Sequence, residues 1–497
     1  MNDSELKREV IKNTVKYTSA QYGARVLGFI ASIGMRRFLG PHSMGIWSLL
    51  LVVVGYSKYT SLGVNNALMF RVPFFLSKGD KKSVDEISDT VFSFSLIGSL
   101  IASFAIIIFT IIFCHNVSPV LKTGLFAISI FVVIERLYAF YIVSLRARNN
   151  FSAVSKAVLF DAVIFLILTI TLVKYFKLYG LYATVCLTTI FNIFFVRKFA
   201  HYSVHLSFNF KRLVGIIKYG LPIFLSGFSN FFLRSIDRIM IAAMLGVSEV
   251  GYYSIALMAR SQMVGFANNF ASVTIPAMLG TYAKEEKIEH IRKFVTVSPN
   301  TISYLIAPVL GLIFFSIEPF VKLVLPQYIM GIVAAEVLLL DIFFRSCESQ
   351  ASQFLIALGK QSRILLPINI VTLIFNVFFN LFFIKVGWGI TGVALGTALA
   401  STLNFMTLQF CAMRHFANAK SIIVYIIKFL IPLLYIITII IILEIIMPNF
   451  NHYARAFCGV IAISLFSLPL YYYVNKKTSV LSIIFSLFRD KITKWKT

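Results

Sequence analysis

The chain has 497 residues, of which 59% are hydrophobic and 13% are charged, whereas a typical soluble domain carries about 25% charged residues. This composition excludes a soluble domain of any size and indicates an all-α polytopic membrane protein. The formal net charge of +26 does not require nucleic acid as a partner, because a basic cytoplasmic face is typical of a protein in anionic lipid.

In chain order, residues 1–16 predict a basic amphipathic segment on the cytoplasmic surface. Apolar stretches of about 20 residues then predict about fourteen transmembrane helices. Six form an N-lobe, 17–199, with spans at 17–37, 43–64, 89–113, 120–145, 153–173 and 178–197. A cytoplasmic connection, 200–213, leads to a C-lobe, 214–412, with spans at 214–244, 249–277, 295–316, 328–358, 363–384 and 388–412. Two more helices, 421–447 and 455–474 within 413–475, precede a basic cytoplasmic tail, 476–497.

The distribution of lysine and arginine predicts the orientation. One set of alternate loops carries most of these residues, as in the cluster Arg71, Lys78, Lys81 and Lys82, while the opposite loops carry few. Because basic loops stay on the cytoplasmic side, both termini are expected in the cytoplasm.

One phrase occurs twice, about 206 positions apart, which indicates two copies of one unit. The first copy is Phe38-Leu39-Gly40, followed after four residues by Gly45-Ile46-Trp47-Ser48. The second copy is Met244-Leu245-Gly246, followed after four residues by Gly251-Tyr252-Tyr253-Ser254. Small residues also recur at every fourth position in both copies, at Gly180, Thr184 and Thr188 and at Gly392, Gly396 and Ala400. Each copy has an even number of spans, so the two pseudo-symmetric six-helix lobes are expected in parallel orientation.

Several cations fall inside the predicted spans, where each costs about 2.5–3.5 kcal/mol unless it faces water or a partner. We expect a cationic, substrate-binding cavity lined by Arg25, Lys58, Arg234, Arg238 and Arg345, and also by Arg136 and Arg260. Arginine favours an anionic cargo, because its planar fork suits phosphate. The alternative is internal ion pairing, since acids stand at helical spacing in Arg234-Asp237-Arg238, in Asp341-Arg345-Glu348 and beside Arg136 at Glu135. Lys428 is expected to snorkel to the interface.

Three further segments stand beside the repeated phrase, namely Gly220-Leu221-Pro222, Leu233-Arg234-Ser235-Ile236-Asp237-Arg238 and Val324-Leu325-Pro326-Gln327-Tyr328. On the repeated phrase and these three segments, the chain resembles the polysaccharide transporter (O-antigen flippase) family. This family belongs to the multidrug/oligosaccharidyl-lipid/polysaccharide exporter superfamily. The resemblance covers essentially the whole chain and implies two six-helix lobes around a V-shaped cavity, plus two C-terminal helices. It also implies a transporter of the bacterial cytoplasmic (inner) membrane, not an enzyme. The implied work is to move undecaprenyl-diphosphate-linked glycans to the outer leaflet, with other polysaccharide-assembly proteins as plausible partners.

The sequence also narrows the energy source. It contains no G-x-x-x-x-G-K-[ST] motif, so ATP hydrolysis by the chain is not expected. No cofactor or metal is expected, and His201 and His205, which lie in the connection between the lobes, lack further ligands. Coupling to an H+ or Na+ gradient could reset the empty carrier, and the candidate ion-coupling acids are Asp161, Asp237, Glu135, Glu336 and Asp341.

Two alternative functions remain. A cation-coupled multidrug exporter could use the same scaffold, although the arginine excess argues against cationic drugs. A polysaccharide polymerase or ligase would be expected to carry a large outer loop with catalytic groups, whereas the predicted outer loops are short.

Overall fold

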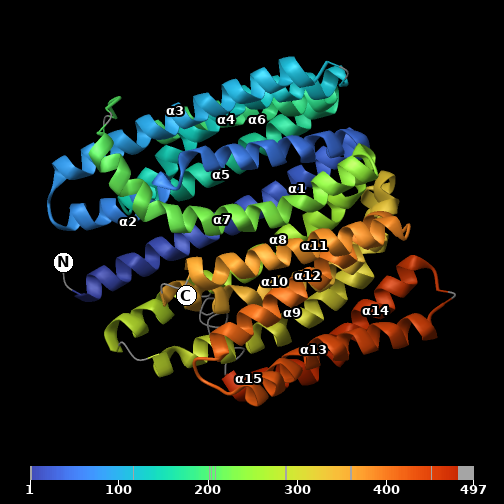
Figure 1. Cartoon of the computed structure of the whole chain (residues 1–497). Coiled ribbons are helices and arrows are strands. Elements are labelled where there is room, and N and C mark those ends of the chain that lie inside the picture. The colour runs from blue at the N-terminus through green and yellow to red at the C-terminus, as the bar shows by residue number, and fades with distance from the viewer. Residues whose placement is uncertain are drawn as a thin grey trace, which may run out of the picture. The chain divides into compact units, whose positions relative to one another are not determined.

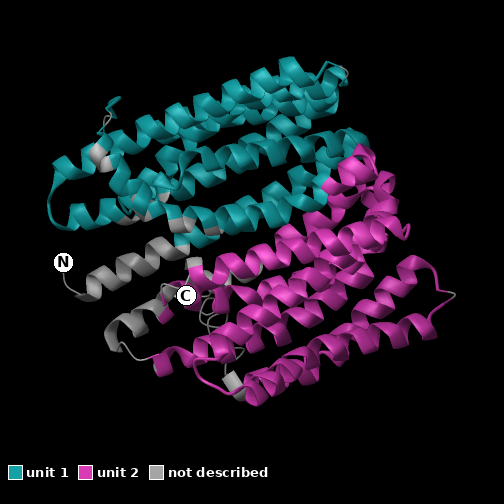
Figure 2. Ribbon diagram, viewed as in Figure 1, with its two compact units in different colours: residues 1–239 teal, residues 240–497 magenta. Residues whose placement is uncertain are grey.

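Long helices account for nearly all of the chain in the computed structural model, which describes residues 3–115, 117–200, 202, 204–207, 209–285, 288–358, 361–448 and 450–478 (Figure 1). Over these residues there is no strand, which confirms the all-α class predicted from the sequence. The chain divides into two compact units, residues 1–239 and 240–497, coloured separately in Figure 2.

The first unit contains six complete helices and most of a seventh. They are α1 (Asp3–Ser57), α2 (Val64–Ser77), α3 (Lys81–Phe113), α4 (Pro119–Ala147), α5 (Phe151–Leu168), α6 (Lys174–Arg197) and, as far as residue 239, α7 (Phe210–Met244). A 3-10 turn, Lys58–Ser61, joins α1 to α2, and a π-helical turn, Thr169–Val173, joins α5 to α6.

The second unit contains the remaining helices. They are α8 (Val247–Glu285), α9 (Ile288–Val324), α10 (Ile332–Ala357), α11 (Leu366–Lys385), α12 (Gly389–Met413), α13 (Ala419–Ile446), α14 (His452–Phe466) and α15 (Leu468–Thr478). In this unit α10 packs against α8, α9 and α12. The most apolar stretches of α10 and α12 are 61% buried, against 28% in α13, so α10 and α12 form the interior while α13 presents a broad apolar face outward.

Ten segments of the described chain are long and apolar enough to cross a membrane. Two of them, Lys16–Ser61 and Phe151–Arg197, have 46 and 47 residues, about twice the length that one span needs. Each contains a non-helical residue, Gly40 with φ 74° in the first and Lys177 with φ 52° in the second, so each holds two spans. With the long helices α7 and α8 added, the helices match the count of about fourteen predicted from the sequence.

The repeated phrase has the same backbone role in both copies. Gly40 and Gly246 both adopt positive φ, 74° and 108°, a conformation that glycine reaches without steric cost. In the first copy Pro41 follows, and in the second copy α8 begins at Val247. Each phrase therefore forms the connection between two consecutive helical segments, which explains why the sequence repeats there.

Small residues in α12 lie where α11 comes closest. A Cβ atom on Gly396 would lie 2.4 Å from Oδ1 of Asn380, and one on Gly392 would lie 2.6 Å from Cβ of Phe383. Contacts this short leave no room for a side chain, so the small-residue pattern does permit the close helix approach predicted from the sequence.

The connection between α6 and α7 is anchored to the first unit. The guanidinium of Arg148 lies 3.8 Å from the ring centroid of Tyr202, and the backbone amides of His205 and Ser207 donate to side chains on α3, each at 3.0 Å. Burial raises the pKa of the Tyr202 hydroxyl and lowers the pKa of Arg148. His201, the other histidine of this connection, lies outside the described residues.

Candidate functional site

The charged residues predicted inside the spans are distributed unevenly over the two units. The first unit holds Arg25, Lys58, Glu135, Arg136, Asp161, Arg234, Asp237 and Arg238. The second unit holds Arg260, Glu336, Asp341 and Arg345. Most of the candidate cations therefore belong to the first unit.

Lys58 forms the most open ion pair among these residues. It stands where α1 ends, and its Nζ lies 3.0 Å from Oε1 of Glu135 on α4. Half of the Lys58 side chain is exposed, whereas the Glu135 side chain is 19% exposed. The ammonium of Lys58 is therefore the more accessible partner of this pair and can approach a second anion.

Arg136, next in sequence, is buried and supports the end of α1. Its Nη2 donates to the carbonyl oxygen of Ser57 at 3.3 Å, and the hydroxyl of Thr60 donates to the same oxygen at 2.8 Å. Ser57 is the last residue of α1, and a helix C-terminus carries partial negative charge and unsatisfied carbonyl groups. This geometry gives Arg136 a structural role at the break that follows, where Leu62 and Gly63 have positive φ.

The charged residues of α7 face different surroundings. Arg234 is exposed, Asp237 is 1% exposed, and Arg238 is half-buried with its Nη1 donating to the carbonyl oxygen of Ser48 at 3.3 Å. Among these residues, Arg234 presents the most open guanidinium.

Arg25 and Asp161 complete the set in the first unit. Arg25 is half-buried on α1, and its guanidinium carbon lies 6.0 Å from the ring centroid of Tyr22. Asp161 on α5 accepts a hydrogen bond from the side-chain amide of Asn192, which is fully buried on α6. Asp161 therefore joins two helices.

In the second unit, the charges form one buried network. Asp341 on α10 is fully buried and lies 2.8 Å from Nε of Arg260 on α8 and 3.1 Å from Nε of Arg345. Arg345 also lies 3.3 Å from Glu348. The network contains two guanidinium groups and two carboxylates, so its formal charges balance. The sequence spacing predicts the pairing within α10, but the link to Arg260 depends on how α8 packs.

Uncharged side chains extend this network to α11 and α12. The Ser401 hydroxyl donates to Asp341, and the Asn404 amide donates to Glu348 at 3.0 Å. The Thr372 hydroxyl in turn donates to the Asn404 side-chain oxygen at 3.2 Å. Because buried polar groups are costly unless hydrogen-bonded, these partners make the charged cluster tolerable inside an apolar unit.

Buried asparagines on α11 continue the polar face. The Asn380 amide donates to Asn376 and the Asn376 amide donates to Thr397, each at 3.2 Å. The pattern of charged residues in the spans does not include these uncharged side chains, so it did not predict them. Their signal was present, since asparagines in an apolar span mark a polar helix face in the same way as charges do.

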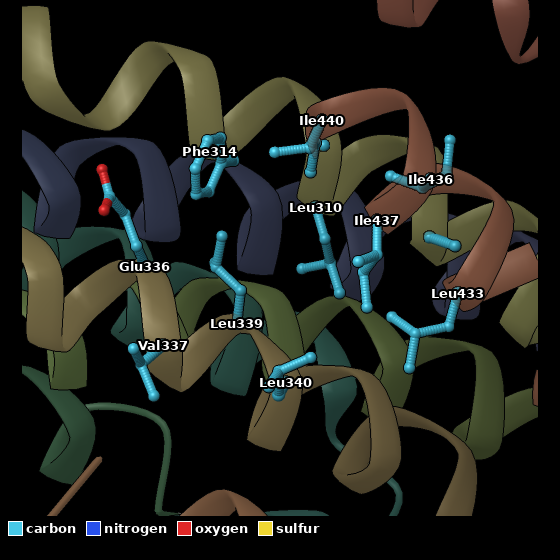
Figure 3. A pocket seen from close by; sticks show the side chains of 12 residues that line it. Leu310, Phe314, Glu336, Val337, Leu339, Leu340, Leu433, Ile436, Ile437 and Ile440 are labelled. Atoms are coloured by element: carbon cyan, nitrogen blue, oxygen red, sulfur yellow. The ribbon is translucent and has the colours of Figure 1, made fainter. Parts of the chain in front are cut away.

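Glu336 lies on a cavity of about 290 Å³ between α9, α10 and α13 (Figure 3). Apart from this carboxylate, the described residues that line the cavity are apolar: Ala307, Leu310, Gly311, Phe314, Val337, Leu339, Leu340, Leu433, Ile436, Ile437 and Ile440. A single carboxylate beside an apolar cavity suits a hydrophobic ligand that carries at most one cationic group.

Comparison with known proteins supports the resemblance drawn from the sequence. A family model described as "Polysaccharide biosynthesis protein" matches residues 35–334. A search of curated proteins finds no match. Among solved structures, the lipid II flippase MurJ in an inward closed conformation is similar, with a TM-score of 0.71 and 15% identity over 93% of this chain and 99% of that one.

Two other solved structures are also similar. An inward-facing multidrug resistance MATE family transporter of the MOP superfamily gives a TM-score of 0.63 at 16% identity, over 79% of this chain and 94% of that one. A MOP superfamily transporter from Pyrococcus furiosus, described as having a binding pocket of reverse polarity, gives 0.59 at 15% identity, over 82% and 95%. These matches show that the chain has the fold shared by MurJ and the MATE proteins.

Proposed function

We propose that this chain, which belongs to the polysaccharide biosynthesis protein family, is a flippase for an undecaprenyl-diphosphate-linked oligosaccharide, such as an O-antigen or other surface polysaccharide repeat unit. The cargo would pass from the cytoplasmic to the outer leaflet of the bacterial inner membrane by alternating access. The observation that carries this proposal is the concentration of span cations in the first unit of a chain with a flippase-like fold.

Physical chemistry links those cations to the cargo. A diphosphate with several sugars cannot cross hydrocarbon unaided, because each polar group stripped of water costs several kcal/mol. Cations held within the membrane replace the lost hydration, and Lys58 and Arg234 present the most open charged groups of the first unit. An inside-negative membrane potential favours the outward movement of an anion by roughly 2.3 kcal/mol per elementary charge for each 100 mV.

The test is lipid-linked oligosaccharide flipping by purified protein in proteoliposomes, beside analysis of the lipid-linked glycan that accumulates in cells lacking the gene. Lys58→Met removes the open ammonium, and we expect a fall in flipping of about tenfold or more, the equivalent of one lost charge-assisted contact. Lys174→Met, at an exposed lysine that starts α6, is the matched control and should keep wild-type activity. Normal flipping by a well-inserted Lys58→Met variant would contradict a role for the open ammonium.

The coupling ion belongs to the same proposal. Among the candidate acids, Glu135 and Asp341 already balance cations, whereas Glu336 lies beside an apolar cavity. We therefore favour Glu336 for H+ or Na+ coupling. Undiminished flipping after collapse of both gradients in vesicles would rule out this coupling.

A second candidate function, cation-coupled multidrug export, rests on the Glu336 cavity. An apolar cavity with one carboxylate suits a hydrophobic cation better than a diphosphate. Ethidium efflux from cells separates the two functions: efflux that is lost in a Glu336→Gln variant would favour the exporter, and absence of efflux together with glycan flipping would favour the flippase.

A further inference from the structure

A second cavity in the unit formed by residues 240–497 has a different chemical character from the Glu336 cavity. It has a volume of about 210 Å³ and lies between α9, α13 and α15. The residues that line it are Thr296, Val297, Asn300, Thr301, Tyr304, Tyr425, Lys428, Tyr473 and Val474. None of these lining residues is acidic, and Lys428 carries the only formal charge among them.

This cavity lies toward the basic end of its helices. The hydroxyl of Tyr425, near the start of α13, donates to the carbonyl oxygen of Thr296, near the start of α9, at 2.9 Å. The same end therefore carries the basic residues at the start of these helices, Arg292 and Lys293 on α9 and Lys420 on α13. Positive charge near one membrane surface attracts anionic lipid.

The donors that remain for a ligand can be identified by elimination. The hydroxyls of Thr296 and Thr301 donate to carbonyl oxygens one turn earlier in α9, at 3.0 and 2.9 Å. Tyr425 is occupied as described. The exposed ammonium of Lys428, the side-chain amide of Asn300 and the hydroxyl of Tyr304 remain, and Lys428 is the charged one of these donors. The buried Oδ1 of Asn300 has no hydrogen-bond partner among the described residues.

The rest of the wall consists of aromatic rings and aliphatic side chains, apart from the hydroxyls of Tyr304 and Tyr473. Tyr304 and Tyr473 stack with ring centroids 5.2 Å apart, and Val297 and Val474 complete the lining. A cavity with an ammonium and an amide beside aromatic and aliphatic walls matches a molecule that joins an anionic group to a hydrocarbon chain. A free inorganic anion would leave the apolar wall without a partner.

We propose that this cavity binds the phosphate of an anionic phospholipid of the surrounding membrane. Lys428 contacts the phosphate, the Asn300 amide contacts the phosphate or a glycerol hydroxyl, and the first acyl carbons lie along Val297 and Val474. The site is separate from the proposed transport function, so the bound phospholipid is a resident partner and not cargo.

Native mass spectrometry of the full chain in detergent tests this proposal. The probes are dioleoylphosphatidylglycerol, its phosphate-free counterpart dioleoylglycerol, undecaprenyl phosphate and inorganic phosphate. In the wild type, phosphatidylglycerol should give the tightest adduct. Lys428→Met should weaken that adduct by about tenfold, the equivalent of one charge-assisted hydrogen bond. Lys428→Arg should retain binding, as should Lys420→Met, which removes a neighbouring charge that does not line the cavity.

The results divide clearly. Loss of the phosphatidylglycerol adduct in Lys428→Met alone supports the site, and unchanged binding in that variant overturns it. Equal binding of dioleoylglycerol would show that phosphate is not recognised. Tighter binding of inorganic phosphate or of undecaprenyl phosphate than of phosphatidylglycerol would overturn the assignment to a resident phospholipid. It would identify that molecule as the ligand of the cavity instead.

Discussion

Removing the carboxylate of Asp341 should destabilise the protein more than any other acid-to-amide change in the charge network. Asp341 is fully buried and contacts two guanidinium groups, at 2.8 and 3.1 Å. Asp341→Asn would remove one of the two carboxylates that balance the two buried guanidinium groups. Breaking a buried pair on one side costs about 3–5 kcal/mol, because the surviving charge keeps its desolvation penalty.

Glu348→Gln should cost less. Glu348 lies 3.3 Å from Arg345 and also accepts a hydrogen bond from the uncharged Asn404, and the Arg345 guanidinium keeps its contact with Asp341 after the change. We expect a loss of about 1–3 kcal/mol, the range for an interaction with one charged partner. The matched control is Glu289→Gln, which removes an acid from an exposed pair with Arg292 at 3.9 Å and should cost less than about 1 kcal/mol.

The measurement is the midpoint of thermal unfolding of the purified protein in detergent. Each kcal/mol corresponds to roughly 2–4 °C for a unit of this size, so Asp341→Asn should lower the midpoint by about 6 °C or more. The double variant Arg260→Met/Asp341→Asn restores charge balance and should be more stable than the sum of its single variants by about 0.5–3 kcal/mol. The reasoning would be refuted if Asp341→Asn lowered the unfolding midpoint no more than the Glu289→Gln control does. It would also be refuted if the effects of Arg260→Met and Asp341→Asn on stability were additive in the double variant.

Two further predictions use the same unfolding assay or amide exchange. Gly63→Ala should destabilise by about 1–3 kcal/mol, because Gly63 has φ 79° and its Cβ would lie 2.8 Å from the carbonyl oxygen of Gly220. Gly28→Ala, in a helical position with no atom near the new Cβ, should instead stabilise by about 0.5–1 kcal/mol, and the opposite order of the two would contradict this account. Tyr202→Phe should keep the contact with Arg148, whereas Tyr202→Leu should lose about 0.5–2 kcal/mol and speed amide exchange in residues 204–207; equal exchange in both variants would argue against the contact.

The difference between the two units bears on which charges can serve transport. In the second unit, Arg260 and Arg345 are each held by a carboxylate within about 3 Å, and a substrate phosphate would have to displace that carboxylate. In the first unit, Lys58 is also paired with a carboxylate, Glu135 at 3.0 Å, but half of its side chain is exposed, and the Arg234 side chain is exposed as well. Substitutions at Lys58 and Arg234 should therefore reduce flipping activity strongly while they lower the stability of the protein only slightly.

Sequence alone determined the membrane class, the approximate spans, the duplication and the family. Each of these depends on features that add up along the chain, such as the length of an apolar stretch or a glycine after a leucine at the end of a span. The turns at Gly40 and Gly246 are examples, since glycine permits the positive φ that these turns require. The pairing of Arg345 with Asp341 and Glu348 was also predictable, because residues three and four apart share a helix face.

The tertiary structure alone decided which charges meet across helices. Arg260 and Asp341 are far apart in the chain and form a pair only because α8 packs on α10. Arg136 reaches the end of α1, and Lys428 faces a cavity rather than lipid alone, for the same reason. Ion pairs and cavities depend on distances of a few ångströms between neighbouring helices, and hydropathy and charge patterns along the chain do not contain those distances.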